Sequence, residues 1–172
     1  METTEKFSGL ASVYAAGRPA YADEFLTELY EKFGFSTKSV MADIGSGTGK
    51  FVKQMLDRGS YVYCVEPNED MRNQANIKLG KYKNCSIVAG DAYNTTLQDC
   101  SVDFITVAQA FHWFDINLFK RECQRIIRTS GKAFLVWNMR DMNADITQKA
   151  IRFIRNTALN LKALAAEYKK MI

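Results

Sequence analysis

Residues 40–51 read VMADIGSGTGKF, a short apolar run that ends in a carboxylate and passes into a loop of alternating glycines. A second apolar run, compatible with a helix, follows as far as Leu56. The pattern predicts a strand, a tight turn and a helix. Glycine suits such a turn because a Cβ would forbid positive φ and would hold a ligand away from the backbone. The segment therefore predicts a cofactor loop beside the unpaired N–H groups of a helix N-terminus.

The spacing of the glycines separates three classes of cofactor loop. Gly45, Gly47 and Gly49 alternate, and Lys50 stands where the third glycine of a dinucleotide fingerprint belongs. A phosphate loop needs a glycine five positions before Gly49 and a Ser or Thr after the lysine, but apolar residues occupy both places. The spacing therefore argues against NAD and against ATP or GTP bound in that manner.

The pattern Asp43-x-Gly45-x-Gly47-x-Gly49 resembles the first motif of class I S-adenosylmethionine-dependent methyltransferases. In that family the loop passes the methionine part of the cofactor, which has no phosphates. The resemblance implies S-adenosylmethionine as cofactor and S-adenosylhomocysteine as product. It also implies cofactor contacts for Asp43, Gly45, Ser46, Gly47 and Gly49.

Bulk composition bounds the class of protein. A chain of 172 residues with 47% apolar residues is long enough for one domain with a sizeable core. The net charge of +4 comes without an arginine-rich block, so nothing favours a nucleic-acid partner. No apolar run has the length of a signal core or a membrane span, and we expect a cytoplasmic protein without a membrane partner.

Four cysteines and one histidine bear on metal and redox chemistry. The cysteines contain no C-x-x-C pair, so reduced, mostly buried thiols are favoured over a disulfide. With only His112 as a histidine we expect no metal site.

Short apolar runs alternate with helix-like segments or turn-rich loops along the middle of the chain. This alternation predicts an α/β fold with a doubly wound, mostly parallel sheet of the Rossmann-like kind, covered by helices on both faces. We expect helices from about Tyr21 to Phe33, from Asn68 to Gly80, and from Asp115 or Asn117 to Arg128, with Ser130-Gly131-Lys132 turning the chain into the last strand. The expected strands are Val40–Ile44, Tyr61–Val65, Ser86–Ala89, Phe104–Ala108 and Ala133–Trp137.

We expect one domain with three parts. Residues 1–36 form an N-terminal helical cap, residues 37–140 the cofactor-binding core, and residues 141–172 a C-terminal helix with a three-four apolar spacing. That helix is expected to pack on its own domain, with a coiled-coil partner as the alternative. Class I methyltransferases normally continue into two further strands, the last antiparallel, so the chain looks truncated and lacks that pair.

The carboxyl ends of parallel strands form the binding edge of an open α/β sheet. Glu66 ends the second strand, where a carboxylate can accept two hydrogen bonds from a ribose diol; a solvated turn residue is the alternative. Asp91 ends the third strand and, by resemblance, accepts the exocyclic amine of adenine, unless it only caps a turn. The resemblance adds to these the neighbouring cofactor residues Pro67, Asn68, Met71 and Ala92, with the apolar side of Met71 against the purine.

The run from Ala108 to Asp115 reads AQAFHWFD, and similar Ala-x-His-Trp-Phe segments follow the fourth strand in trans-aconitate-type and related small-molecule methyltransferases. By that resemblance Gln109, Ala110 and Trp113 lie near the sulfur end of the cofactor. His112 is a candidate general base because its ordinary pKa is near 6.5, with a packed structural histidine as the alternative. The fifth strand end, at Asn138, receives no role.

The segment Tyr14-x-x-x-Arg18-Pro19-x-Tyr21 resembles the opening of the same small-molecule enzymes, in which it lies over the cofactor. Tyr14 and Arg18 are candidates for closing the pocket, Arg18 by holding a carboxylate; a surface contact is the alternative for either. No Asn/Asp-Pro-Pro-Tyr/Phe segment follows the fourth strand, which lowers the expectation of a nucleic-acid substrate further.

The sequence thus predicts an S-adenosylmethionine-dependent methyltransferase that acts on a small molecule by in-line displacement, as a monomer or weak homodimer. Positioning of methyl and nucleophile can supply much of the rate, so a general base is not required. Two alternatives stay open: a non-catalytic, methyltransferase-like module that binds the cofactor or a partner, and an NAD-dependent oxidoreductase.

Overall fold

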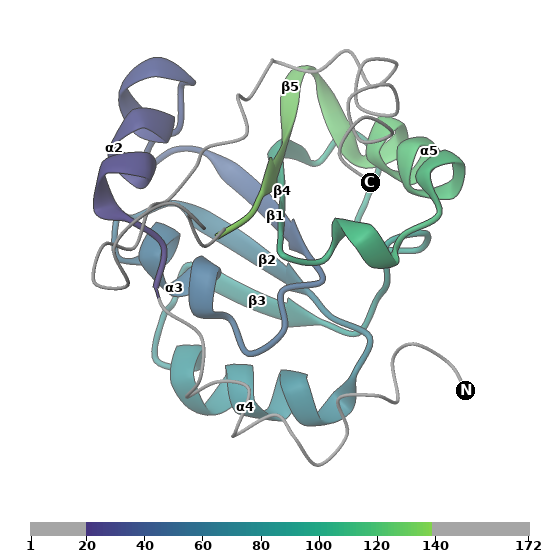
Figure 1. Ribbon diagram of the computed structural model, residues 1–172, viewed down its shortest axis with the longest axis horizontal. Coiled ribbons are helices and arrows are strands. Elements are labelled where there is room, and N and C mark those ends of the chain that lie inside the picture. Colours follow the sequence, from purple (N-terminus) through teal and green to yellow (C-terminus); the bar gives the residue numbers. More distant parts are fainter. Residues whose placement is uncertain (1–19, 139–172) are drawn as a thin grey trace, which may run out of the picture.

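The computed structural model describes residues 20–138, which form a sheet with helices on both of its faces (Figure 1). The predictions for Tyr14, Arg18 and the C-terminal helix lie outside these residues. Five strands make the sheet: β1 (Val40–Ile44), β2 (Tyr61–Val65), β3 (Cys85–Val88), β4 (Val102–Ala108) and β5 (Ile127–Val136). They run parallel in the order β3-β2-β1-β4-β5, so the chain reverses its winding beside β1. The predicted doubly wound sheet is confirmed.

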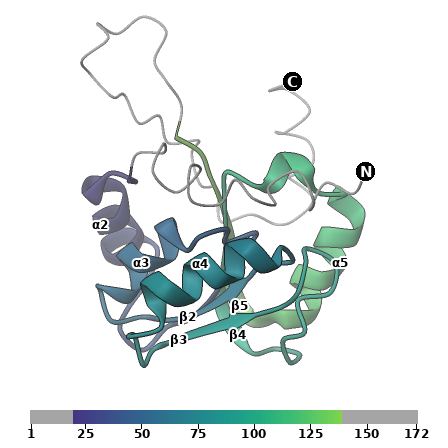
Figure 2. The ribbon, with the colours of Figure 1, turned by 90° about the horizontal axis from the view of Figure 1, so that it is seen from below.

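Helices α2 (Asp23–Lys32), α3 (Lys50–Leu56) and α4 (Glu69–Leu79) lie on one side of the sheet, and α5 (Ile116–Ile126) lies on the other (Figures 1 and 2). The core is divided in the same way. Leu26, Val52 and Met55 pack with Met41 of β1 in one buried cluster. The other cluster joins α5 to the opposite face of β1, because side chains alternate along a strand. Burial on both faces explains why the strands read as apolar runs.

Polar side chains fix where two of the helices begin. Asn68 Oδ1 accepts the Met71 N–H at 3.0 Å at the start of α4. Asp115 Oδ1 accepts the N–H groups of Asn117 and Leu118, each at 2.9 Å, at the start of α5. Both satisfy backbone donors that a helix N-terminus leaves unpaired. The predicted starts of these helices are confirmed.

The predicted end of α5 at Arg128 is wrong, because the chain enters β5 at Ile127 without a loop. Ile127 pairs with Val102, and Lys132 pairs with Phe104. Four residues of β5 therefore lie opposite Asp103 alone, and the predicted Ser130-Gly131 turn is a bulge inside the strand. A Cβ at Gly131 would approach the Asp103 carbonyl oxygen to 2.7 Å, so this bulge needs glycine.

The connection from β3 to β4 is held against α5 by a buried carboxylate. Glu122 Oε1 accepts the N–H of Thr95 at 2.7 Å, and Arg125 Nη2 donates to the same oxygen at 2.7 Å. Arg125 Nη1 also donates to the carbonyl of Leu97 and to Asp99. Burial raises the pKa of Glu122, but the hydrogen bonds from Arg125 and Thr95 outweigh it, and the net pKa lies below its ordinary value. This clamp positions the segment that carries Asp91.

All four cysteines are free thiols, as expected. Cys64 and Cys123 are buried, Cys85 is half-buried and Cys100 is exposed, so the expectation of mostly buried thiols holds only in part. Within residues 20–138, no helix combines the length and the apolar composition that crossing a membrane requires.

Candidate functional site

The three glycines of the loop after β1 all have positive φ, but their surroundings differ. A Cβ at Gly45 would lie 2.8 Å from the Cβ of Ala110, and a Cβ at Gly49 would lie 2.3 Å from Cδ1 of Leu79. A Cβ at Gly47 would meet no atom of residues 20–138 within 4 Å. Gly45 and Gly49 are thus required by packing inside the protein, whereas Gly47 presents bare backbone to an open space. Gly47 is where a ligand can approach the loop most closely.

Glu66, directly after β2, joins the glycine loop to the start of α4. Its Oε2 accepts the N–H of Gly47 at 2.9 Å, and its Oε1 accepts the N–H of Asn68 at 2.9 Å. Arg72 Nη1 donates to the carbonyls of Glu66 and Pro67 at 3.0 and 2.6 Å, which fixes the turn from outside. Each carboxylate oxygen keeps a second lone pair, so Glu66 can still accept two hydrogen bonds from a diol.

Burial raises the pKa of Glu66 above its ordinary value, and the hydrogen bonds from Asn68 and Gly47 offset part of that rise. The side chain is 8% exposed. A largely buried carboxylate gains most from a ligand that brings its own hydrogen-bond donors. The alternative interpretation of Glu66 as a solvated turn residue therefore does not fit its surroundings.

Asp43, the last carboxylate before the loop, is 1% exposed in the centre of the sheet. Its Oδ1 accepts a hydrogen bond from Thr106 Oγ1 at 2.6 Å, and the two residues are register partners on β1 and β4. Burial raises the pKa of Asp43 to about 7; the Thr106 hydrogen bond lowers it and the nearby charge of Glu66 raises it. Asp43 thus lies in the sheet below the glycine loop, and its hydrogen bond to Thr106 links β1, which leads into the loop, to β4.

The raised pKa of Asp43 predicts a measurable pH dependence of stability. The folded state holds this proton up to about pH 7, whereas the unfolded chain releases it near pH 3.8. Between these values the folded state binds more protons, so rising pH reduces the free energy of unfolding by at most about 1.4 kcal/mol per pH unit. Asp43→Asn should reduce this slope, leaving the smaller contribution of Glu66, and urea unfolding at pH 5, 6 and 7 measures it. Equal slopes in wild type and variant would contradict the assignment.

The third strand end is built differently from the second. Asp91 is exposed, and its Oδ1 accepts the N–H groups of Tyr93 and Asn94 at 2.7 and 2.8 Å. Asp91 thus caps a turn, which is the alternative to its role at the adenine. Its other oxygen, Oδ2, stays available to face an adenine amine. Ala92 is buried, and Met71 is 3% exposed within the protein core. The contact of Met71 with a purine therefore stays a prediction.

The fourth strand end lies against the glycine loop through Ala110. Gln109 precedes it with φ of +61°, a conformation that is uncommon outside glycine. Two hydrogen bonds hold it there: its N–H donates to the carbonyl of Val136 at 2.8 Å, and its Nε2 donates to the carbonyl of Asn138 at 3.0 Å. Gln109 therefore ties the end of β4 to the end of β5, beside the loop.

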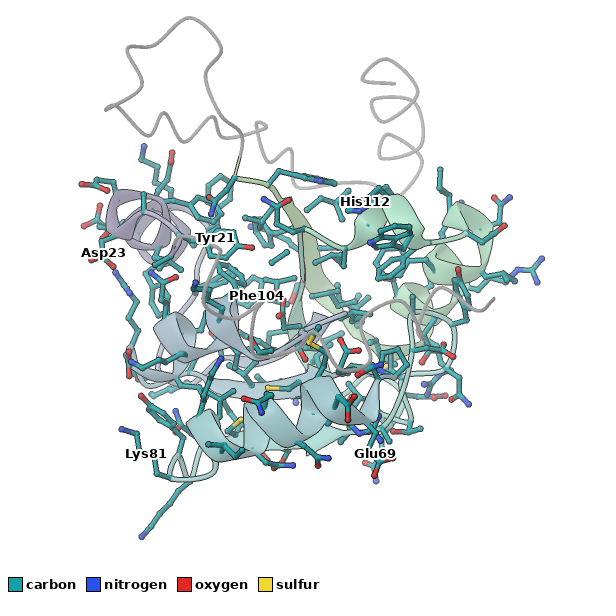
Figure 3. The ribbon with its side chains drawn as sticks, turned by 60° about the horizontal axis from the view of Figure 1, so that its bottom comes forward. Tyr21, Asp23, Glu69, Lys81, Phe104 and His112 are labelled. Carbon is teal, nitrogen blue, oxygen red and sulfur yellow. The ribbon has the colours of Figure 1, made fainter. Side chains whose placement is uncertain are left out.

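His112 and Trp113 occupy the short 3-10 helix η2 (Phe111–Trp113), where both are exposed. Their rings lie 4.7 Å apart, whereas Phe111 is buried below them. Figure 3 shows His112 in the upper half of the view, with Tyr21 and Asp23 further to the left. The ring contact with Trp113 is compatible with the alternative, a packed structural histidine among aromatic residues. The role of His112 as a base stays a prediction.

Two buried side-chain polar atoms in the described part of the chain have no hydrogen-bond partner. One is Ser46 Oγ in the glycine loop, and the other is Asn138 Oδ1 after β5. Buried polar atoms are nearly always paired, so an unpaired one marks a place where a ligand can bind. Ser46 was predicted as a cofactor residue; Asn138 was recognised only as a strand end.

Thr106, Arg72 and Asn138 were missed in the sequence. Thr106 carried a signal, because a hydroxyl inside a buried apolar run needs a partner, and the neighbouring strand offers Asp43. Arg72 and Asn138 carried none, since an arginine on a helix and an asparagine after a strand are ordinary residues at those places.

Comparison with known proteins identifies the family of this chain. A family model described as a methyltransferase domain matches residues 42–135. An uncharacterised methyltransferase-like protein of Schizosaccharomyces pombe is 30% identical over 82% of this chain and 54% of its own length. An uncharacterised methyltransferase of Mycobacterium bovis is 34% identical over 78% of this chain and 53% of its own.

Among solved structures, one described as a methyltransferase from an antibiotic biosynthesis pathway of Anabaena variabilis is 31% identical with a TM-score of 0.59. The match covers 72% of this chain and 49% of that one. The chain spans about half the length of each of these relatives.

Proposed function

Because this chain belongs to the class I S-adenosylmethionine-dependent methyltransferases, we propose that its described site binds that cofactor and serves methyl transfer to a small-molecule acceptor. The observation that supports this most is the arrangement of Glu66 and Gly47. A largely buried carboxylate with free lone pairs stands next to bare glycine backbone that faces open space. A cofactor that carries a ribose diol and no phosphate matches both features.

The residues of the site fit the parts of such a cofactor. Glu66 would accept the ribose hydroxyls, Ser46 Oγ would bond the amino-acid part, and Asp91 Oδ2 and Ala92 would lie at the adenine. Gln109 and Ala110 would lie near the sulfur, with Trp113 at the rim. Pro67, Asn68 and Met71 support the ribose side. The bound cofactor supplies an electrophilic methyl group on a sulfonium, which is already a good leaving group.

The protein then has three tasks. It aligns the acceptor with the methyl group, which can supply several kcal/mol. It excludes water, a task for which Tyr14 and Arg18 remain proposals. It receives the acceptor's proton where one is lost, and His112, exposed in η2, is the candidate because an imidazole can act as a general base.

A small-molecule acceptor is favoured by the modest net charge of +4 and by the absence of a basic block in the sequence. The proposal includes a cytoplasmic location, a monomer or weak homodimer, and residues 37–140 as the cofactor-binding core between the cap of residues 1–36 and the helix of residues 141–172.

The experiment is a transfer assay with methyl-labelled S-adenosylmethionine and a panel of alcohols, amines, phenols and carboxylic acids, with tRNA and a basic peptide as competing classes. We expect label in one small-molecule class only. Label in the tRNA or the peptide would contradict the small-molecule acceptor. Cofactor binding without transfer to any member would favour the non-catalytic module.

A further inference from the structure

The end of β5 carries a hydrogen-bond acceptor that no group in the described part of the chain uses. Asn138 Oδ1 is buried and is one of the two unpartnered side-chain polar atoms within residues 20–138. The main-chain carbonyl of the same residue is bonded to Gln109 Nε2 at 3.0 Å. The backbone of Asn138 is therefore held by a hydrogen bond, while its buried side-chain oxygen has none. A buried oxygen without a hydrogen bond lowers the stability of the fold. The presence of one at Asn138 therefore points to a ligand that supplies the missing donor.

The position of Asn138 connects it to the proposed transfer site. The hydrogen bond from Gln109 joins Asn138 to the end of β4. Ala110, which follows Gln109 in the chain, lies against Gly45 of the cofactor loop. Gln109 is held at φ +61° by its two bonds to the end of β5. Uncommon backbone conformations of this kind persist where the surroundings enforce them, often at binding sites. Asn138 thus stands one strand beyond the residues that we assign to the sulfur end of the cofactor.

We propose that Asn138 Oδ1 receives a hydrogen bond from the acceptor molecule, which therefore carries an O–H or N–H donor, such as a hydroxyl or amine, beside the methylated atom. An ionised carboxylate has only acceptor oxygens and would leave Oδ1 unpaired. The inference rests on the proposed function and narrows its substrate class to hydroxyl- or amine-bearing molecules. Asn138 is a positioning residue, because an amide oxygen orients a donor without taking its proton.

The first test measures whether Oδ1 is unpaired in the free protein. Asn138→Leu keeps the branched shape and removes the oxygen, so its unfolding midpoint should rise by at least about 2 °C. The matched control is Asn84→Leu. Asn84 Nδ2 donates to the carbonyls of Leu56 and Ser60 at 3.3 and 2.8 Å, so this midpoint should fall. A fall for Asn138→Leu as large as that for Asn84→Leu would show a structural partner and overturn the proposal.

The second test uses matched probes on the full chain, with and without saturating S-adenosylhomocysteine: phenol with anisole, indole with 1-methylindole, and benzoate. Wild type should bind phenol and indole, which carry a hydrogen-bond donor, about tenfold more tightly than their methylated counterparts. It should bind benzoate more weakly than phenol. Asn138→Leu and Asn138→Ala should lose that preference, and Asn138→Asp, which keeps an acceptor, should retain it.

The role of Asn138 would be overturned if wild type bound each probe and its methylated counterpart equally, or bound benzoate more strongly than phenol. A donor preference that survives in Asn138→Ala would overturn it as well. A chain that binds no S-adenosylhomocysteine would contradict the proposed function, while the probe preference measured without it would still decide the role of Asn138.

Discussion

Glu66→Ala should weaken binding of S-adenosylhomocysteine at least a hundredfold, or about 3 kcal/mol, because two hydrogen bonds from a diol to a buried carboxylate are lost together. The variant also leaves the N–H groups of Gly47 and Asn68 without their acceptor, so the glycine loop loses the side chain that holds it to the start of α4. Isothermal titration gives the affinity, and urea unfolding shows that the fold remains.

Glu69→Ala is the matched control for this experiment. Glu69 is an exposed carboxylate three residues further on, at the start of α4 (Figure 3). Its removal should change the affinity less than threefold, since it has no part in the site. Glu66→Gln should fall between them, because both oxygens of Glu66 accept backbone N–H groups and an amide can replace only one. Unchanged affinity in Glu66→Ala would remove the ribose assignment.

Gly49→Ala should reduce the free energy of unfolding by about 2–5 kcal/mol, the sum of strain at positive φ and overpacking. The φ of Gly49 is +74°, and the new Cβ would lie 2.3 Å from Cδ1 of Leu79, which is 1% exposed and has no room to move away. The midpoint of thermal unfolding should fall by about 5–15 °C.

Gly47→Ala separates the packing role of the loop from its binding role. Its φ is +55°, but a Cβ there meets open space, so the stability loss should be only about 1–2 kcal/mol. The same Cβ would occupy the face that we assign to the cofactor, so the affinity for S-adenosylhomocysteine should fall at least tenfold. A Gly47→Ala variant that is less stable than Gly49→Ala would contradict this division of roles.

Much of the fold was predictable because its signals are local. The apolar runs of β1 and β2 were placed at their observed bounds, since strands buried on both faces contain little but apolar residues. The starts of α4 and α5 were predictable from Asn68 and Asp115, whose side chains cap them. The end of α5 was not, because Ile127 enters β5 by pairing with Val102, a residue that lies far away in the sequence.

The residues of the candidate site also divide into those that local sequence patterns predict and those that depend on strand pairing. The contact of Glu66 with the glycine loop was foreseeable, because adjacent parallel strands bring their carboxyl ends together. The turn formed by Asp91 was stated only as an alternative, because a short polar side chain after a strand suits both roles equally well. The hydroxyl of Thr106 inside an apolar run indicates a buried partner, but that this partner is Asp43 depends on which strands are neighbours. The unpaired oxygen of Asn138 has no local signal in the sequence.

Thermal unfolding of the chain with S-adenosylmethionine, S-adenosylhomocysteine, NADH and ATP tests the central claim most directly. A ligand at a hundred times its dissociation constant stabilises the folded state by about 2.7 kcal/mol, a shift of roughly 5–11 °C for a domain of this size. We expect that shift with the two adenosyl ligands and none with NADH or ATP. A shift with NADH alone, or with none of the four, would contradict the assignment of this glycine loop to an adenosyl cofactor.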